Sequence, residues 1–280
     1  MLFRVSNLER DSKCGTVFSR VYRMQNQENM NKTNKNTKTV AIVLAGGRGT
    51  RMGGDVPKQY MDVCGKPLLY YTIKAFEDSF IEKIVLVCGK GDEDYVREQI
   101  VSKYGFDKVC GIAYGGRERY HSVYNGLKYI KDNMPEYAGD DCVVFIHDGA
   151  RPLVNGEILK RCYEDALEYG SGVAAVMSKD TVKIADENGF VVSTPQRDKV
   201  YLMQTPQTFS FGLIEKAYGS LMDDMDRILR SGITITDDAM VLEYFSDKKV
   251  KLSEGSYENI KVTTPEDMGF LENCINKNLY

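Results

Sequence analysis

Short apolar runs alternate with amphipathic segments along most of this chain, beginning near Lys38. Each run is nearly continuous and is bounded by charged residues, glycine or proline. This pattern is typical of strands that are covered on both faces of a parallel sheet. It predicts strands at residues 40–44, 83–88, 108–113, 142–147, 172–177 and 250–253.

The amphipathic segments between these runs predict connecting helices. Right-handed crossovers between parallel strands place such helices on both faces of one sheet. We therefore expect an α/β fold with a doubly wound, mostly parallel sheet. Ligands of such folds bind beyond the carboxyl ends of the strands, where the segments after residues 44, 113 and 147 should meet. The predicted helices cover residues 68–77, 92–103, 119–132, 156–169, 211–220, 223–231, 237–245 and 265–276.

The alternation breaks between residues 180 and 205. Two short strand-like stretches there flank a turn at Asp186–Gly189, so we expect a β-hairpin that protrudes as an arm. Residues 1–38 show little hydrophobic periodicity and many Asn, Gln, Lys and Arg, and we predict a disordered extension. The folded domain is expected at residues 39–280.

Charge and composition exclude several classes of protein. The net charge is -3, but residues 1–38 hold eight Lys and Arg against three Asp and Glu (+5), which leaves -8 for the remainder. An acidic body argues against nucleic acid as a partner, and no apolar run approaches the roughly 20 residues of a membrane helix. The seven cysteines form no C-x-x-C pair, so we expect reduced thiols and a cytoplasmic protein.

A glycine-rich segment follows the first predicted strand and carries the strongest chemical signal. Gly46, Gly47 and Gly49 allow backbone N–H groups to approach an anion, and Arg48, Arg51 and Lys58 add positive charge. These residues predict a polyphosphate site. The spacing matches neither G-x-G-x-x-G nor G-x-x-x-x-G-K-[ST], which argues against a nicotinamide-dependent oxidoreductase and a P-loop enzyme. A plain glycine turn is the alternative.

A second motif, HDGARP, ends the strand at 142–147. A carboxylate such as Asp148 at this edge is a natural Mg²⁺ ligand, and Arg151 is suited to bidentate phosphate binding. A structural Asp that caps the next loop is the alternative, and we interpret His147 as structural. In the GGRERYHS segment, Ser122 and the backbone near Gly116 are candidates for reading a base edge, although a helix start also explains them.

Two motifs near the C-terminus are harder to interpret. Asp237 or Thr236 in TDDAM suits the N-cap of a helix. Lys261 precedes a helix that begins with proline, and adds another basic group near the same sheet edge. A lone lysine in such a position is usually solvated.

Taken in order, the motifs resemble those of the 2-C-methyl-D-erythritol 4-phosphate cytidylyltransferase family, over residues 39–276. The motifs are LAGGRGTRM, PKQY, GGRERYHSVYNGL, HDGARP, DTVK, QTPQTF, TDDAM and NIKVTTPEDM. The resemblance implies a Rossmann-like nucleotidyltransferase fold. It also implies transfer of CMP from CTP to methylerythritol phosphate with Mg²⁺ or another divalent cation, in a homodimer joined through the arm.

The resemblance also implies roles for individual residues. CTP would contact the glycine segment and the GGRER segment, Asp148 would hold the metal, and arm residues would reach the acceptor across the dimer. Arg117 departs from the family, where Asp occurs, which puts that side-chain contact in doubt. The implied catalytic residues are Arg48, Arg51, Lys58 and Lys261. The implied CTP contacts are Ala45, Gly46, Gly47, Gly49, Gly116, Arg117, Arg119 and Ser122. The implied acceptor contacts are Asp148, Arg151, Thr181, Arg197, Thr205 and Lys261.

Two other readings stay open at this point. A ribitol-5-phosphate cytidylyltransferase would share the glycine loop, the PKQ lysine and the TPQ-F segment, although the DTVK, NGL, DGARP and TDDAM forms favour methylerythritol phosphate. A CTP-binding protein without turnover is the other reading, and the presence of Lys58, Asp148, Arg197 and Lys261 argues against it.

Overall fold

The computed structural model describes residues 37–47 and 56–278. The chain divides into two units, Met1–Thr37 and Lys38–Tyr280, and the fold described below is that of the second. The predicted disorder of residues 1–38 concerns a segment that, apart from its last two residues, lies outside the described part.

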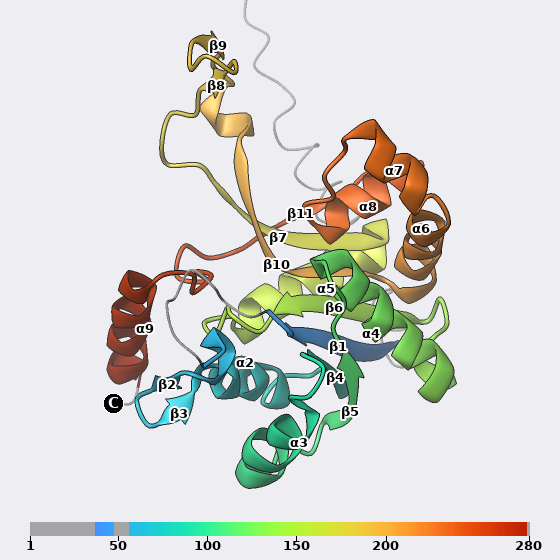
Figure 1. The fold of residues 1–280 in the computed structure, drawn as a ribbon, viewed down its shortest axis with the longest axis vertical. Coiled ribbons are helices and arrows are strands. Elements are labelled where there is room, and N and C mark those ends of the chain that lie inside the picture. The colour runs from blue at the N-terminus through green and yellow to red at the C-terminus, as the bar shows by residue number, and fades with distance from the viewer. Residues whose placement is uncertain (1–36, 48–55, 279–280) are drawn as a thin grey trace, which may run out of the picture. The chain divides into compact units, whose positions relative to one another are not determined.

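A seven-stranded sheet forms the centre of the described part, with the order β11-β7-β10-β6-β1-β4-β5 (Figure 1). β10 is antiparallel to both of its neighbours, and the other strands run parallel. The expected mostly parallel α/β sheet is therefore confirmed. The strands are β1 (Lys38–Ala45), β4 (Lys83–Cys88), β5 (Val109–Tyr114), β6 (Cys142–Asp148), β7 (Ser171–Met177), β10 (Tyr201–Ser210) and β11 (Leu252–Glu254).

Helices cover both faces of the sheet, as the doubly wound prediction requires. α4 and α6 pack on one face, and α2 and α5 pack on the other. α3 is short and continues as a π-helix over Val96–Ser102. The helices are α2 (Leu68–Glu77), α3 (Glu93–Tyr95), α4 (Arg119–Asn133), α5 (Gly156–Tyr169), α6 (Phe211–Asp223), α7 (Met225–Ser231), α8 (Asp238–Phe245) and α9 (Pro265–Asn278), with 3₁₀ turns at Lys58–Tyr60, Pro135–Tyr137 and Arg197–Lys199.

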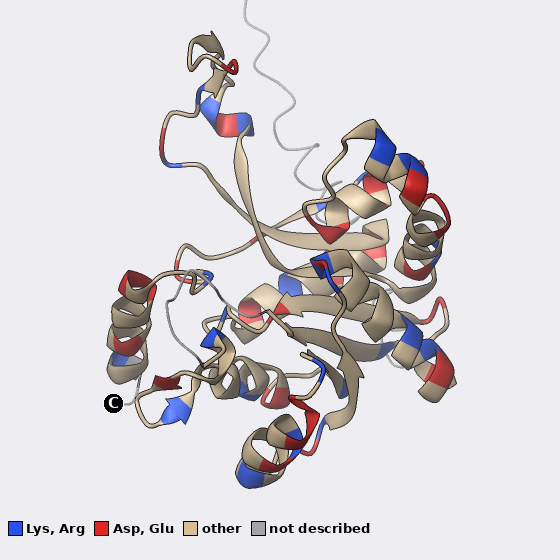
Figure 2. Cartoon of the chain, in the orientation of Figure 1, with Lys and Arg blue, Asp and Glu red and all other residues tan. Residues whose placement is uncertain are grey.

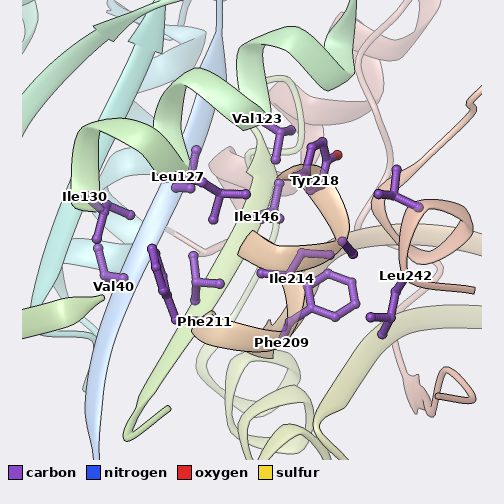
Figure 3. Packing of buried hydrophobic residues seen from close by; sticks show 14 of the residues in the cluster. Val40, Val123, Leu127, Ile130, Ile146, Phe209, Phe211, Ile214, Tyr218 and Leu242 are labelled. Carbon is purple, nitrogen blue, oxygen red and sulfur yellow. The ribbon is translucent and has the colours of Figure 1, made fainter. Parts of the chain in front are cut away.

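The period-two alternation of the strands builds two hydrophobic cores. In β1, Val40 and Ile42 face α4 and α6, whereas Ala41 and Val43 face α2 and α5. Figure 3 shows the first core, where Leu127 of α4 and Ile214 of α6 meet the strand residues. Because all of these side chains are fully or almost fully buried, the strand ends that carry the site are held rigidly.

A smaller core fastens the C-terminal helix. Val262, Leu271 and Ile275 pack against Val63 and Leu68, close to the two-stranded sheet of β2 (Asp62–Val63) and β3 (Lys66–Pro67). This packing holds the segment before α9, which includes Lys261, against the body of the domain.

The arm is a β-hairpin of β8 (Ile184–Ala185) and β9 (Val191–Ser193), and it projects away from the sheet (Figure 1). Its turn at Asp186–Gly189 is confirmed by hydrogen bonds from the Asn188 and Phe190 N–H groups to Asp186 Oδ1. The predicted boundary at residue 205 is too late, because β10 begins at Tyr201 and Thr205 is buried in the sheet.

β10 itself was missed by the sequence pattern. Its sequence contains a proline and several polar residues, which argue against a central strand. The structure resolves this conflict with an irregularity between Met203 and Gln207 in the pairing with β7, which accommodates Pro206. Strand pairing on both sides of β10 then outweighs the weak preference of its sequence for a β-strand.

Charged residues lie mainly on the outer helices and the arm, while most of the sheet is uncharged (Figure 2). Over residues 37–47 and 56–278, no helix has the length and apolar character needed to cross a membrane.

Candidate active site

A pocket of about 540 Å³ lies at the carboxyl edge of the sheet. It is formed by the end of β1, the end of β6, the segment that leads from β5 into α4, and the segment before α9. This is the edge at which α/β sheets bind their ligands. Its described lining residues are Leu44, Ala45, Gly46, Gly47, Lys58, Gln59, Gly116, Arg117, Glu118, Arg119, Ser122, Asp148, Ala150 and Lys261.

The glycine segment begins directly at the end of β1. Ala45, Gly46 and Gly47 line the pocket, and the buried Gln59 donates from Nε2 to the Ala45 carbonyl at 2.7 Å. This hydrogen bond fixes the backbone where the strand turns into the loop. Three predicted contacts, Arg48, Gly49 and Arg51, lie outside the described residues.

The start of α4 forms the opposite wall. The Gly116 N–H donates to Ser122 Oγ at 3.0 Å, so both candidate base contacts belong to one turn. A side chain at Gly116 would place its Cβ 2.2 Å from the His121 Cβ, which explains why glycine occupies the position. The Arg117 side chain is 91% exposed and makes only a loose pair with Glu118.

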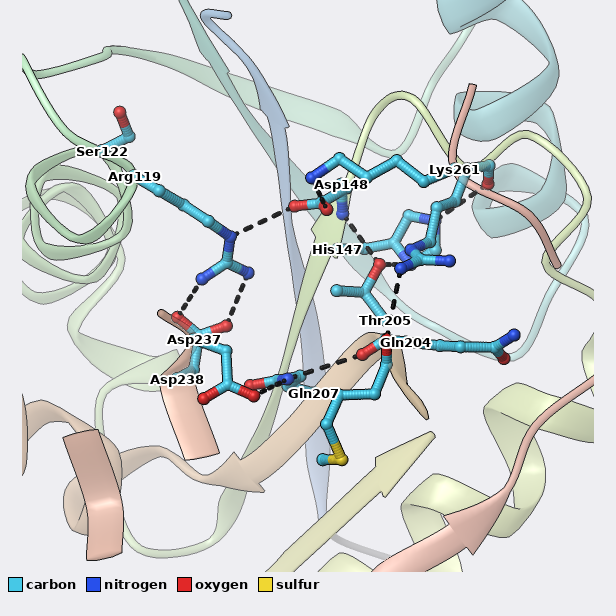
Figure 4. A network of polar contacts seen from close by, with 12 residues as sticks. Arg119, Ser122, His147, Asp148, Gln204, Thr205, Gln207, Asp237, Asp238 and Lys261 are labelled. Atoms are coloured by element: carbon cyan, nitrogen blue, oxygen red, sulfur yellow. Dashed lines mark hydrogen bonds and ion pairs between the residues drawn. The ribbon is translucent and has the colours of Figure 1, made fainter. Parts of the chain in front are cut away.

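Asp148 lies between two cations in this pocket (Figure 4). Its Oδ2 is 2.7 Å from Lys261 Nζ, and its Oδ1 is 3.3 Å from Arg119 Nε. Burial alone would raise the pKa of Asp148, but Arg119 and Lys261 together hold it well below the ordinary range. The carboxylate is therefore ionised at every physiological pH.

The two lysines of the pocket are linked through the segment before α9. Lys58 Nζ donates to the Val262 carbonyl at 2.9 Å, and the Val262 N–H donates to the Ala150 carbonyl at 2.8 Å. Lys261 is the preceding residue. The Lys58 ammonium and the Lys261 backbone are therefore held by the same short segment, residues 261–262.

A hydrogen-bonded chain supports Asp148 from behind. The Asp148 N–H donates to Thr205 Oγ1 at 3.1 Å, and Thr205 Oγ1 lies 3.1 Å from His147 Nδ1. His147 Nε2 faces the Arg151 carbonyl at 3.0 Å, so this nitrogen carries the proton. Burial lowers the His147 pKa to about 4. The neutral ring then accepts from the Thr205 hydroxyl, in agreement with a structural histidine.

Arg151 lies next to the pocket and is not one of its lining residues. Its guanidinium donates to the Asn259 carbonyl at 2.8 Å and to the Met203 carbonyl at 3.4 Å. Burial lowers its pKa. In this geometry Arg151 supports the segment that carries Lys261, and phosphate binding by Arg151 stays a prediction.

The two arm residues lie apart from the pocket of their own chain. Arg197 donates to Thr181 Oγ1 at 3.0 Å, and both side chains are exposed. Neither lines the pocket.

Sequence reasoning missed three polar residues around the site. Gln59 stands inside the PKQY motif, Glu118 caps α4, and Asp238 stands inside TDDAM beside the N-cap residue Asp237. The motifs contained the signal, but sequence alone does not show that Asp238 is fully buried against Arg119.

The side chains around the pocket limit how a metal ion can be bound. Among the described residues, no group of three or more Asp, Glu, His or Cys side chains is arranged to hold one. Mg²⁺ is commonly held by one or two carboxylates together with substrate phosphates. Asp148 offers one carboxylate, with lone pairs beyond those facing Arg119 and Lys261. The residues therefore fit a cation that is held largely by phosphate oxygens, and metal binding by Asp148 stays a prediction.

Comparison with known proteins gives a consistent result. The family model for 2-C-methyl-D-erythritol 4-phosphate cytidylyltransferase (IspD) matches residues 39–277. A protein of that name from Lachnoclostridium phytofermentans is 44% identical over 84% of this chain and 95% of its own length, and one from Clostridium perfringens is 41% identical over 85% and 99%.

Solved structures agree with these matches. The 4-diphosphocytidyl-2C-methyl-D-erythritol synthase of Anaerococcus prevotii has a TM-score of 0.71 and 33% identity, covering 88% of this chain and 99% of that one. The Francisella tularensis 2-C-methyl-D-erythritol 4-phosphate cytidylyltransferase has a TM-score of 0.67 and 32% identity, covering 84% and 98%. The chain therefore belongs to the 2-C-methyl-D-erythritol 4-phosphate cytidylyltransferase family.

Proposed function

We propose that this enzyme transfers CMP from CTP to 2-C-methyl-D-erythritol 4-phosphate, forming 4-diphosphocytidyl-2-C-methyl-D-erythritol and pyrophosphate. The observation that carries the proposal is the pocket at the carboxyl edge of the sheet. Its described lining combines a glycine segment, four cationic side chains and two carboxylates. This lining suits two phosphorylated substrates, and the family relatives favour methylerythritol phosphate over ribitol phosphate as the acceptor.

The nucleotide would occupy the side of the pocket between β1 and α4. Backbone N–H groups of the segment Ala45–Gly47 and the ammonium of Lys58 suit binding of the triphosphate. We propose that Arg48, Gly49 and Arg51 complete this triphosphate site. Gly116 and Ser122 present polar groups in one turn, which suits recognition of the cytosine edge. Arg119 lies between this turn and Asp148.

The acceptor would occupy the side near Asp148 and Lys261. A phosphate monoester is already nucleophilic at neutral pH, so its oxygen attacks the α-phosphorus of CTP in line while pyrophosphate leaves. The protein then contributes positioning and electrostatic stabilisation. Lys58 and Lys261 suit this role because both ammonium groups line the pocket and both depend on residues 261–262 for their position.

A divalent cation, when bound at Asp148 and the phosphates, would neutralise charge on the phosphoryl oxygens. Asp148 is suited to hold it because the Arg119 and Lys261 cations keep its carboxylate ionised. We propose Mg²⁺ as this cation.

The site is proposed to be completed by a second copy of the chain. Thr181 and Arg197 are hydrogen-bonded to each other on the arm and lie apart from their own pocket. The arm also exposes apolar side chains, with Phe190 73% and Val192 65% exposed, which favours burial in an interface. A homodimer would place these two residues at the partner's acceptor site.

The activity is tested by pyrophosphate release from CTP and Mg²⁺, with methylerythritol phosphate and ribitol 5-phosphate compared at equal concentration. We expect a strong preference for methylerythritol phosphate. A preference for ribitol 5-phosphate would reassign the acceptor, and no release with either would overturn the proposed reaction.

Contribution across the dimer is tested by mixing two inactive variants, Lys58→Ala and Arg197→Ala. If Arg197 acts on the partner's pocket, each mixed dimer contains one fully intact site and one doubly altered site. Random mixing then restores about a quarter of the wild-type activity. If Arg197 acts within its own chain, every site stays defective and mixing restores nothing.

A further inference from the structure

Arg119 and Asp238 form a buried, two-pronged ion pair beside the pocket. Both terminal nitrogens of Arg119 lie 2.7 Å from the carboxylate oxygens of Asp238. The Asp238 side chain is fully buried, whereas the Arg119 side chain is 27% exposed. Tyr218, in the core, also donates its hydroxyl to Asp238. Figure 4 shows the guanidinium of Arg119 between Asp238 and Asp148.

The location of Arg119 is unfavourable by local rules. It is the first residue of α4, where the helix dipole disfavours a positive charge. Asp238 is the first residue of α8, where the same effect favours a negative charge. Asp238 and Asp148 together outweigh the burial of Arg119 and hold the Arg119 pKa above its ordinary range. A positive charge at the positive end of its own helix dipole breaks a local rule, and such exceptions are characteristic of functional positions.

The backbone that carries Asp238 is held rigidly at the start of α8. Asp237 caps α8 by accepting from the Met240 N–H at 2.9 Å. Gln207 of β10 accepts from the Ala239 N–H at 2.8 Å and donates to Asp237 at 2.9 Å. The backbone on both sides of Asp238 is therefore tied to the central sheet.

We propose that Asp238 is a positioning residue for the nucleotidyl transfer, and that its carboxylate fixes the plane of the Arg119 guanidinium in the pocket. With both terminal nitrogens held, Arg119 cannot rotate about its last bonds, and its Nε stays directed at Asp148 Oδ1. The inference rests on the proposed function, because Arg119 lines the pocket to which CTP and the acceptor are assigned. Asp238 thus acts on the reaction through Arg119 and Asp148 and touches no substrate itself.

The alternative is that the pair only stabilises the fold. A buried ion pair is weak evidence for stability, since apolar residues of similar volume often do as well. The geometry favours positioning, because the Arg119 side chain lines the pocket and is 27% exposed, while the Asp238 carboxylate that holds both of its terminal nitrogens is fully buried.

The experiment is a double-mutant cycle in kcat/KM with Asp238→Asn, Arg119→Met and the double variant, each checked by its Tm. Misplacing a positioned group typically costs on the order of 10² in rate, and we expect a loss of that size for Asp238→Asn. In the Arg119→Met background the same change should have no further effect, because the residue through which Asp238 acts is absent. Losses that multiply in the double variant would overturn the proposal.

Two further variants separate positioning from folding. Asp238→Glu keeps the buried charge but moves the carboxylate, and it stays informative if Asp238→Asn fails to fold. We expect it to lower kcat/KM by at least about tenfold. An unchanged kcat/KM would contradict the proposal, because it would show that the buried charge, and not the position of the carboxylate, sustains the activity. Asn155→Ala removes the N-cap of α5, outside the pocket, so we expect a lower Tm with kcat/KM within about threefold of the wild type.

A crystal structure of the Asp238→Glu variant gives a readout that does not depend on the reaction. We expect Arg119 to lose its contact with Asp148. An unmoved Arg119 in the variant would overturn the inference, even if the wild-type enzyme is active. A displaced Arg119, together with a wild-type protein that has no cytidylyltransferase activity, would refute the proposed function alone.

Discussion

The hydroxyl of Thr205 joins the backbone of Asp148 to the imidazole of His147, accepting from the Asp148 N–H and donating to Nδ1, each at 3.1 Å. This arrangement follows from β10 lying next to β6 in the sheet. It makes one small side chain responsible for two buried polar groups directly behind the pocket. The position of Asp148 therefore depends on a residue that itself does not line the pocket.

Replacing Thr205 by valine should destabilise the fold and weaken catalysis. Valine has nearly the same shape, but it leaves the Asp148 N–H and His147 Nδ1 without their partner. Each buried polar group without a partner costs about 1–3 kcal/mol, and two groups lose theirs here, so we expect the free energy of unfolding to decrease by about 2–6 kcal/mol. Urea denaturation followed by circular dichroism measures it. Thr205→Ser keeps the hydroxyl and is the control; an equal loss in both variants would contradict this account.

Stability should depend on pH through His147. The unfolded chain binds a proton at this residue below its ordinary pKa of 6.5, whereas the folded protein does so only near pH 4. The unfolded state therefore binds more protons between these values, and stability rises with pH through this window. Going from pH 7 down to pH 4 should cost up to roughly 3 kcal/mol at this site.

The check is urea denaturation of the wild type and of His147→Gln between pH 7 and pH 4. The variant is expected to be less stable at neutral pH, but its stability should depend less on pH above about pH 4.5. At lower pH, carboxylates also take up protons. One of them is Asp267, whose pKa is lowered by backbone N–H donors despite partial burial. Parallel curves for the two proteins would show that His147 does not titrate on unfolding.

Much of this architecture was predictable because its elements carry strong periodic patterns. The runs that became β4 and β6 are apolar on both faces, and α2 has the predicted bounds, residues 68–77. β10 was not predictable, because its pairing partners, and not its own residues, determine its conformation. The same holds for the Arg119–Asp238 pair, whose members are 119 residues apart, so no local pattern links them.

Removing the ammonium of Lys58 should reduce turnover strongly. Loss of one preorganised donor at a transition state typically costs about 10²–10³ in kcat, and we expect at least this loss for Lys58→Ala in pyrophosphate release. Lys74→Ala is a suitable control, since Lys74 pairs with Asp78 on the exposed side of α2 and does not line the pocket. Turnover close to that of the wild type would remove Lys58 from the catalytic residues.

Lys261 is expected to act mainly on the acceptor. Its Nζ lies 2.7 Å from Asp148 Oδ2, on the side of the pocket away from the turn that holds Gly116 and Ser122. Lys261→Met removes the charge and largely keeps the length of the side chain. We expect kcat/KM for methylerythritol phosphate to fall by about 10²-fold, because the positioned cation is lost.

The affinity for CTP should change much less in the same variant, by less than about threefold, since the triphosphate is assigned to the glycine segment and Lys58. Calorimetric titration with CTP, next to steady-state kinetics with each substrate varied in turn, separates the two effects. Lys251→Met is the matched control, because Lys251 lies over the Tyr169 ring outside this pocket. If CTP affinity fell as steeply as acceptor kcat/KM, Lys261 would belong to the nucleotide site, and the division of the pocket into a nucleotide side and an acceptor side would be wrong.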